Sequence, residues 1–350
     1  MITVKQIAEM CNVSPSTVSN ILNGKTNMAK ETKDRVLKAI EETGYRPNYY
    51  AQGMRRQNNK TICIIAEELT QFSGPPIVGS IMEYAESKGY HVLIINMGMY
   101  EKWKKTGLGL GDEKLLEENT IPAFLEAEAK RADGIIYLAA HGRVLDCVPK
   151  DYSIPVVYCY SVSEDNKCKS VIIDDVKSSY DAIDYLIKQN HKKIGVIAGQ
   201  ADNLHTVLRM QGYMKALSDN GINFDDSLIE YADWERAGGY KCAKKLIKSG
   251  VSAIWCMNDL MAAGVYDCMR EKKLTIGKDV SVMGFDNREM SEYLYPKLST
   301  SEIRLEEIGK AAARIMIKEI ENEEYRAEIK SPMKVDCNLV IRDSVGRFTE

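Results

Sequence analysis

The sequence predicts an all-α helix-turn-helix head, followed by an α/β body of two Rossmann-like lobes. Its length of 350 residues fits two or three domains. The first 46 residues hold three short helical patterns, separated by turn and capping residues. From residue 60 onward, continuous apolar runs alternate with amphipathic helical stretches, which is typical of parallel sheets covered on both faces.

The composition indicates a globular protein of the cytoplasm. Hydrophobic residues make up 45% of the chain, yet no apolar run approaches the roughly 18 residues that a membrane span needs. The opening segment MITVKQIAEM lacks the pattern of a signal peptide. The nine cysteines form no C-x-x-C pair, and the four histidines are far apart in the sequence. We therefore expect reduced thiols, with no disulfide framework, no metal site and no cofactor.

Charge is distributed unevenly along the chain. Residues 1–57 carry nine Lys and Arg against five Asp and Glu, a net charge of +4, which leaves −7 on the remainder of this chain of net charge −3. A basic head on an acidic body indicates that the head meets a polyanion, whereas the body does not.

The head begins with two short helices joined by a tight turn. Thr3 with Gln6 reads as a capping box that starts the first helix. Ser14 caps the second helix, Pro15 is its first residue, and Asn23-Gly24 ends it. This arrangement is a helix-turn-helix unit.

A third helix supports this pair. It is expected from about Lys30 to Thr43, with Gly44 as its stop and with Val36, Leu37 and Ile40 facing inward.

The second helix has an apolar face for packing and a face of small polar groups. Short side chains allow a close approach to DNA phosphates, and the helix N-terminus at Ser14 adds a positive dipole end. Asn20 can pair with both N6 and N7 of adenine, and Ser16 can bond a base edge. The alternative is a three-helix packing module with a polar surface.

The amino-acid sequence of the head resembles that of the DNA-binding head of the lactose-repressor (LacI/GalR) family. The similarity runs through VSPSTVS, VLKAIEE and GYRPN. The resemblance implies that Pro15, Ser16 and Asn20 read bases. It implies phosphate contacts from Ser14, Thr17, Ser19, Asn23 and Thr32. Many relatives have Arg where this chain has Asn20, so a different operator is expected.

Residues 47–59 have the composition of a linker. A helix from Asn48 to Arg55 would be marginal in water, and Gly53 weakens it by about 1 kcal/mol relative to Ala. The resemblance implies a hinge helix that forms in the minor groove, with Met54 as the wedge and Arg55 on phosphates. The alternative is a plain tether.

Polar residues that follow the body's strands form the candidate ligand site, because ligands of parallel sheets bind beyond the carboxyl ends of the strands. An aromatic platform with carboxylates, amides and one arginine suits a small polyhydroxylated ligand. The candidates are Asn203, His205, Arg209, Trp234, Asn258, Asp259 and Asp286. As alternatives, Asp286 caps a turn, Trp234 is ordinary packing and His205 is a loop residue.

The resemblance continues through the body, in blocks such as AIWCMNDLMAAGVYDCMRE and GKDVSVMGFDN. It implies a periplasmic-binding-protein-like body whose chain crosses between the lobes three times, with the ligand in the cleft and Phe72 contributing from the first lobe. The expected domains are 1–46 for DNA binding, 47–59 for the hinge, 60–160 with 293–322 for the first lobe, and 161–292 with 323–341 for the second. Tyr160 stands where many relatives have an Asp that meets the effector.

Together these features predict a transcriptional regulator, most simply a repressor, and not an enzyme. One short recognition helix buries little surface, so we expect a homodimer on a pseudo-palindromic double-stranded operator. The effector is expected to be a carbohydrate that induces. The rival hypotheses are a regulator that answers a purine or another non-sugar ligand as co-repressor, an activator, and a solute receptor without DNA function.

Overall fold

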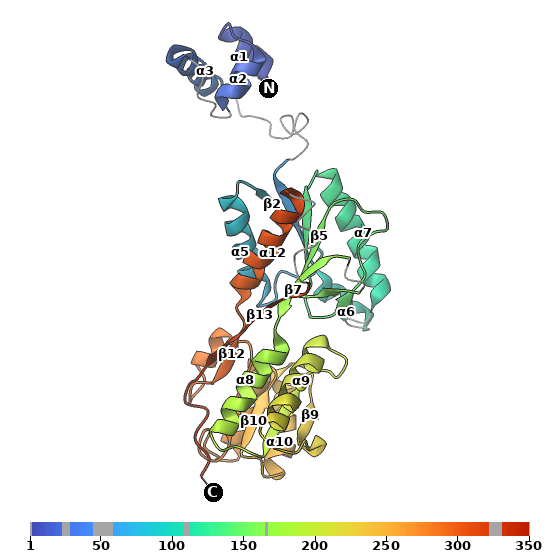
Figure 1. Ribbon diagram of the computed structural model, residues 1–350, viewed down its shortest axis with the longest axis vertical. Helices are drawn as coiled ribbons and strands as arrows, with labels where there is room; N and C mark the ends of the chain where they lie inside the picture. The colour runs from blue at the N-terminus through green and yellow to red at the C-terminus, as the bar shows by residue number, and fades with distance from the viewer. Residues whose placement is uncertain are drawn as a thin grey trace. The chain divides into compact units, whose positions relative to one another are not determined.

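The computed structural model divides the chain into two compact units, Met1–Asn59 and Lys60–Glu350 (Figure 1). The structure describes residues 2–22, 29–44, 59–107, 112–164, 167–321 and 331–349. None of the helices in these ranges is long and apolar enough to cross a membrane.

The first unit contains the three expected helices, α1 (Val4–Met10), α2 (Pro15–Leu22) and α3 (Lys30–Thr43). The capping box of α1 is confirmed, since the Gln6 amide donates to Thr3 Oγ1 at 3.3 Å and the Thr3 amide donates to Gln6 Oε1 at 2.9 Å. Gly44 ends α3 with a left-handed φ of 61°, which glycine adopts without strain.

A small apolar core joins these helices. Its buried members are Ile7, Ala8, Cys11, Val18, Ile21, Val36 and Ala39. The prediction that Leu37 faces inward is wrong, because that side chain is 43% exposed. The buried stripe of α3 runs through Val36, Ala39 and Ile40, at spacings of three and four residues, and Leu37 lies off this stripe.

The second unit contains two sheets. The larger sheet defines the first lobe, and its six strands are all parallel, in the order β13-β7-β5-β3-β1-β2. The strands are β1 (Thr61–Ala66), β2 (His91–Asn96), β3 (Gly134–Leu138), β5 (Val156–Cys159), β7 (Lys169–Ile173) and β13 (Met333–Val335). The helices of this lobe are α5 (Gly74–Ser87), α6 (Met99–Thr106), α7 (Glu113–Ala129) and α12 (Leu305–Glu321).

Both faces of the larger sheet are covered, as the continuous apolar strands predict. Ile62 and Ile64 of β1 pack on the α5 and α12 side, while Cys63 and Ile65 pack on the α6 and α7 side. Figure 1 shows α5 beside α12, with α7 on the opposite side of the sheet.

The smaller sheet defines the second lobe, with the parallel strand order β11-β10-β8-β9. The strands are β8 (Ile194–Ala198), β9 (Ile229–Tyr231), β10 (Ala253–Cys256) and β11 (Ser281–Met283). Helix α8 (Asp175–Lys188) packs on α9 (Leu204–Asp219), and α10 (Arg236–Lys248) packs on α11 (Asp259–Glu271).

Short elements complete this unit. Strands β4 (Val144–Leu145) and β6 (Val162–Ser163) pair in parallel, and β12 (Thr300–Glu302) pairs antiparallel with β14 (Asn338–Val340). Two 3₁₀ turns are η2 (Asp226–Leu228) and η3 (Glu289–Glu292).

The places where the chain changes lobes differ from the expected boundaries. Strand β7 pairs with β5 in the larger sheet, so the first crossing comes after residue 173 and not at 160. The segment from 293 to 302 stays with the second lobe, because Gly284 and Asp286 donate their amides to Ser299 and Ser301. The last crossing follows β13, which joins the larger sheet beside β7. Strand β13 has only three residues, too few to show a pattern that separates it from a loop.

Candidate functional site

Helix α2 presents the polar face expected of a DNA-reading helix. Val18 and Ile21 are buried in the head core. Of the remaining candidates, Ser14, Pro15 and Ser16 are exposed, whereas Thr17, Ser19 and Asn20 are half-buried. The candidate Thr32 is half-buried in the first turn of α3, while Asn23, Met54 and Arg55 lie outside the described residues.

Three hydroxyl groups are held together at the N-terminus of α2. Ser14 Oγ accepts from the Thr17 amide at 3.1 Å, so the predicted cap is confirmed. The same Oγ lies 2.6 Å from Ser16 Oγ and 2.9 Å from Thr17 Oγ1. This turn therefore offers orientable donors beside the positive end of the helix, a combination suited to phosphate.

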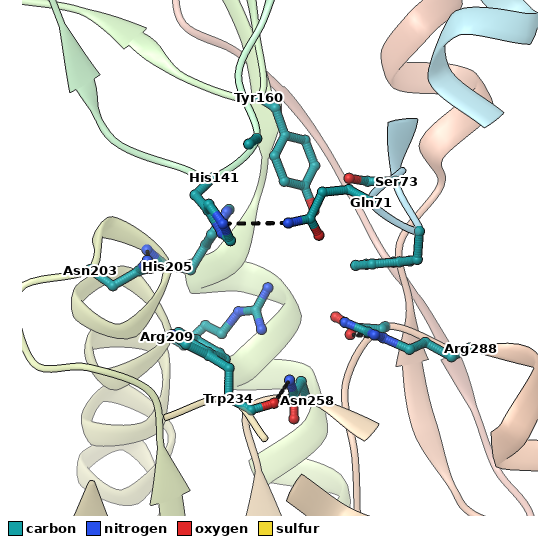
Figure 2. A pocket seen from close by; sticks show the side chains of 13 residues that line it. Gln71, Ser73, His141, Tyr160, Asn203, His205, Arg209, Trp234, Asn258 and Arg288 are labelled. Carbon is teal, nitrogen blue, oxygen red and sulfur yellow. Dashed lines mark hydrogen bonds and ion pairs between the residues drawn. The ribbon is translucent and has the colours of Figure 1, made fainter. Parts of the chain in front are cut away.

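A cleft of the second unit lies where loops of the two lobes face each other. It contains about 490 Å³ of space between protein atoms, part of which is open to solvent. The residues that line it are Gln71, Phe72, Ser73, Ala140, His141, Tyr160, Asn203, His205, Arg209, Trp234, Asn258, Asp286 and Arg288 (Figure 2).

Three of these lining residues have a positive φ, a backbone conformation that residues other than glycine rarely adopt. The φ angles are 71° for Tyr160, 68° for Trp234 and 115° for Asp286. Each residue lies a few positions beyond a strand, β5, β9 and β11 respectively. Such left-handed conformations are costly and concentrate at functional sites, so this cleft is a built feature of the fold.

Arg209 lines the cleft and forms a buried ion pair. Its side chain is 3% exposed, and its Nε donates to Asp175 Oδ1 at 2.7 Å. Its Nη1 donates to the carbonyl of Met257, and the guanidinium carbon lies 3.6 Å from the ring centroid of Phe285. Burial alone would raise the pKa of Asp175, but its interactions with His205 and Arg209 overcome this effect and lower the pKa. Arg209 is thus held rigidly.

Asn258 supports the aromatic platform of the cleft. Its Oδ1 accepts from the Met261 amide at 2.8 Å as the cap of α11, and its Nδ2 donates to the Trp234 carbonyl at 2.9 Å. Each end of the side chain therefore makes one hydrogen bond within the protein and can make one more.

Asp286 and Asp259 form a pair of buried carboxylates on the second lobe. Asp286 Oδ2 accepts from Arg288 Nε at 2.8 Å, whereas Asp259 accepts from Thr300 Oγ1 and from the Arg288 amide, each at 2.7 Å. Burial raises the pKa of Asp259 to about 7, with a further contribution from the charge of Asp286. Burial also raises the pKa of Asp286.

The first lobe contributes a rim of polar and aromatic groups. His141 Nε2 lies 3.1 Å from Tyr100 Oη and 3.4 Å from Gln71 Nε2, and the last contact is drawn in Figure 2. Burial, with the charge of Arg143, lowers the pKa of His141 to about 3. The imidazole of His141 is therefore neutral at physiological pH.

Seven of the eight predicted ligand-site residues line the cleft together, namely Phe72, Asn203, His205, Arg209, Trp234, Asn258 and Asp286. Asp259 does not line it, because its carboxylate is fully buried behind Asp286. Sequence reasoning missed Gln71, Ser73, Ala140, His141 and Arg288 as lining residues. Arg288 follows Asp286 by two positions, which was the available signal. Among the described residues, no group of three His, Cys, Asp or Glu side chains is arranged to hold a metal ion.

Two family descriptions match the chain. Residues 3–48 match the lacI family of bacterial regulatory proteins, and residues 183–345 match a periplasmic binding protein-like domain.

Curated relatives cover nearly the whole chain. The transcriptional repressor PurR of Pasteurella multocida (strain Pm70) is 29% identical, over 99% of each chain. The ribose operon repressor of Haemophilus influenzae (strain Rd KW20) is 27% identical, over 99% of each. The repressor CytR of Escherichia coli (strain K12) is 28% identical, over 98% of this chain and 96% of its own.

Solved structures of 22–23% identity share the fold. The lac repressor dimer bound to operator and an anti-inducer superposes with a TM-score of 0.78, over 98% of each chain. A complex of the transcriptional regulator CelR with cellobiose gives 0.65, over 98% of this chain and all of its own.

Proposed function

Because this chain belongs to the lacI family of bacterial regulatory proteins, it is a DNA-binding transcriptional regulator and not an enzyme, and we propose that it is a repressor controlled by a carbohydrate. The head supplies DNA recognition through α2. The cleft supplies ligand recognition through the second unit. The observation that carries the ligand proposal is the meeting of Arg209, Trp234 and Asp286 in one cleft.

The chemistry of this cleft suits a hydroxylated ring. Trp234 and Phe72 offer aromatic surface, and Asp286 Oδ1 has no hydrogen-bond partner among the described residues. A carboxylate oxygen accepts from sugar hydroxyls, while Arg209 donates to them. Among the relatives, one represses the ribose operon and one structural neighbour holds cellobiose, which also favours a carbohydrate.

The DNA proposal requires two copies of the head. Helix α2 is eight residues long, and a single helix of this length contacts too few bases for selective binding. We therefore propose a homodimer that reads a pseudo-palindromic operator, with Asn20 and Ser16 at base edges and Ser14, Thr17 and Ser19 at phosphates. The lac repressor structure with a similar fold is itself a dimer on operator.

Control of DNA binding is proposed to act through the contacts between the lobes. A ligand that touches both lobes changes the free energy of their arrangement. If operator affinity also differs between these arrangements, linkage requires that the ligand change operator affinity. We propose induction, in which the ligand-bound arrangement has the lower operator affinity.

The test is selection of DNA from a random pool by the full-length protein, repeated with sugars and with nucleobases. The expected result is an enriched pseudo-palindrome that is lost with one of the sugars. A thermal-shift screen of the same compounds identifies the ligand, because binding to the native state raises the melting temperature. If a nucleobase and not a sugar changes the enrichment, the effector is a purine and not a carbohydrate. If no DNA sequence is enriched, the proposal that the protein is a transcriptional regulator is refuted.

A further inference from the structure

Arg288 is a preorganised cation at the boundary between the lobes. Its Nε donates to Asp286 Oδ2 at 2.8 Å, and its guanidinium carbon lies 4.0 Å from the ring centroid of Phe72 on the other lobe. The side chain is 24% exposed. Neither terminal nitrogen has a hydrogen-bond partner among the described residues. Asp286 holds the Nε edge of this guanidinium, and Phe72 lies against one of its faces. The two terminal nitrogens are therefore left to face the cleft.

Arg209 brings a second unused donor to the same cleft. Its Nε and Nη1 are engaged by Asp175 and by the carbonyl of Met257. Its Nη2 has no hydrogen-bond partner within the described part of the chain, although the side chain is 97% buried. Figure 2 shows the guanidinium groups of Arg209 and Arg288 directed into the cleft from its two sides.

The carboxylates near these arginines are already matched. Asp175 accepts from Arg209 and lies 2.8 Å from His205 Nδ1, and Asp286 accepts from Arg288. Asp259 is turned to Thr300 and the backbone behind the cleft. Three cationic N–H-bearing nitrogens therefore remain, against one free oxygen of Asp286. Arginine forks in partly dry sites pair best with carboxylate or phosphate oxygens.

We propose that the ligand of this cleft is a carbohydrate that carries an anionic group, a phosphate or a carboxylate, which the free donors of Arg288 and Arg209 bind. The ring of the ligand lies over Trp234, and one of its hydroxyls donates to Asp286. This proposal rests on the function proposed above and narrows its ligand class. Arg288 is then a specificity-determining residue, because it distinguishes the charged compound from its neutral parent.

Matched sugars test this proposal on the full-length protein. Glucose is compared with glucose 6-phosphate and glucuronate, and ribose with ribose 5-phosphate, by thermal shift and titration calorimetry. Sodium phosphate alone is a further probe, with sodium chloride at equal ionic strength as its control. We expect at least one anionic sugar to bind about tenfold or more tightly than its neutral parent, the effect of one charge-assisted hydrogen bond.

Substitutions at Arg288 test whether this residue causes the preference for the anionic sugar. Arg288→Met should remove the preference for the anionic sugar, and Arg288→Lys, which keeps the charge but lacks the fork, should retain part of it. Arg270→Met is the matched control, because Arg270 is 78% exposed and pairs with Asp267 on the surface. Its preference should equal that of the unsubstituted protein.

The outcomes separate this inference from the proposed function. A neutral sugar that binds as tightly as its anionic partners overturns the inference, as does a panel in which no anionic sugar binds. In both cases the enriched operator of the selection experiment still supports a regulator. A preference for the anionic sugar that survives in Arg288→Met also overturns the role of Arg288.

Discussion

The backbone amide of Gly142 donates to Nε2 of His205 across 3.2 Å, and this bond joins a loop of the first lobe to α9 of the second. Nδ1 of the same ring lies 2.8 Å from Asp175 Oδ2. Since Nε2 accepts from Gly142, the ring proton is on Nδ1 and is donated to Asp175. One imidazole thus ties the buried ion pair of Arg209 to the opposite lobe.

Gly142→Ala should disrupt this contact between the lobes. A Cβ at position 142 would lie 2.4 Å from His205 Nε2, so the ring must move. We expect a loss of about 1–3 kcal/mol in the free energy of unfolding, measured with urea, and weaker ligand binding. Gly79→Ala is the control, because its Cβ meets no atom within 4 Å on helix α5, and it should not destabilise the protein. Equal effects of both substitutions would contradict the role of this contact.

Gly199→Ala should remove the aromatic platform. An added Cβ would lie 1.9 Å from Cζ2 of Trp234, and an indole cannot yield to this extent without leaving its position. The expected result is loss of the ligand-induced thermal shift with operator affinity unchanged. Trp234→Phe, which keeps a smaller ring, should retain part of the shift. A full ligand response in Gly199→Ala would show that Trp234 does not contact the ligand.

Arg209→Met should be more destabilising than a double substitution that removes both charges. The single change leaves Asp175 buried, at 2% exposure, without its main partner, which costs about 3–5 kcal/mol. In Asp175→Asn with Arg209→Met no charge is left unpaired, so at least half of this loss should be recovered. Urea unfolding measures both variants. Both should also lack a ligand response, whereas a double variant no more stable than the single one would show that the charge pair is not the cause.

Asp259→Asn should stabilise the protein more at pH 8 than at pH 5.5. The pKa of Asp259 is about 7 in the folded protein, against an ordinary value near 3.9, so the folded state holds a proton that the unfolded chain has released. Stability therefore falls as pH rises from about 4 to about 7, by at most about 1.4 kcal/mol per unit, and the Asn variant lacks this slope.

Asp267→Asn is the control for that pH dependence. Arg236 lowers the pKa of Asp267, so its contribution is complete above the ordinary value and does not change between pH 5.5 and 8. Urea unfolding at the two pH values measures both variants. A difference between Asp259→Asn and the unsubstituted protein that is the same at both pH values would exclude the proposed titration.

Asn20→Ala should cost about 1–3 kcal/mol at the selected operator and relax the choice at one base pair. Asn20 is half-buried on α2, beside the exposed Ser16. Lys38→Ala is the control, because Lys38 lies on α3 with its side chain 75% exposed in a pair with Glu42, and it should not alter base preference. If the Asn20→Ala variant selects DNA with the same base preference as the unsubstituted protein, Asn20 does not contact a base.

The sequence predicted the elements better than their assignment to lobes. Runs such as those of β1 and β8 are buried on both faces and therefore read as strands. Strands β7 and β13 do not form such runs, because β13 has three residues and β7 begins with a polar pair, Lys169 and Ser170. The lobe that a short strand joins depends on neighbours distant in sequence, which no local pattern encodes.

The ligand cleft was predictable on the second lobe and much less so on the first. Asn203, Trp234 and Asp286 follow strands whose carboxyl ends share one edge, so their meeting follows from the fold class. His141 and Gln71 also follow strands, but their loops are irregular and their partners come from other segments. Asn258 lines the cleft, yet only the structure reveals that each end of its amide also makes a hydrogen bond within the protein.

The triple crossing between lobes has a consequence for synthesis of the protein. Strand β13 completes the first sheet. Ser344 joins two segments of the second lobe, because its Oγ accepts from the Ser299 amide at 2.7 Å and donates to the Val282 carbonyl at 2.6 Å. Both lobes therefore need the segment 333–344. On the ribosome the head can fold early, but neither lobe can be completed before residues 333–344 have been synthesised, and a truncation before β13 would disable both lobes at once.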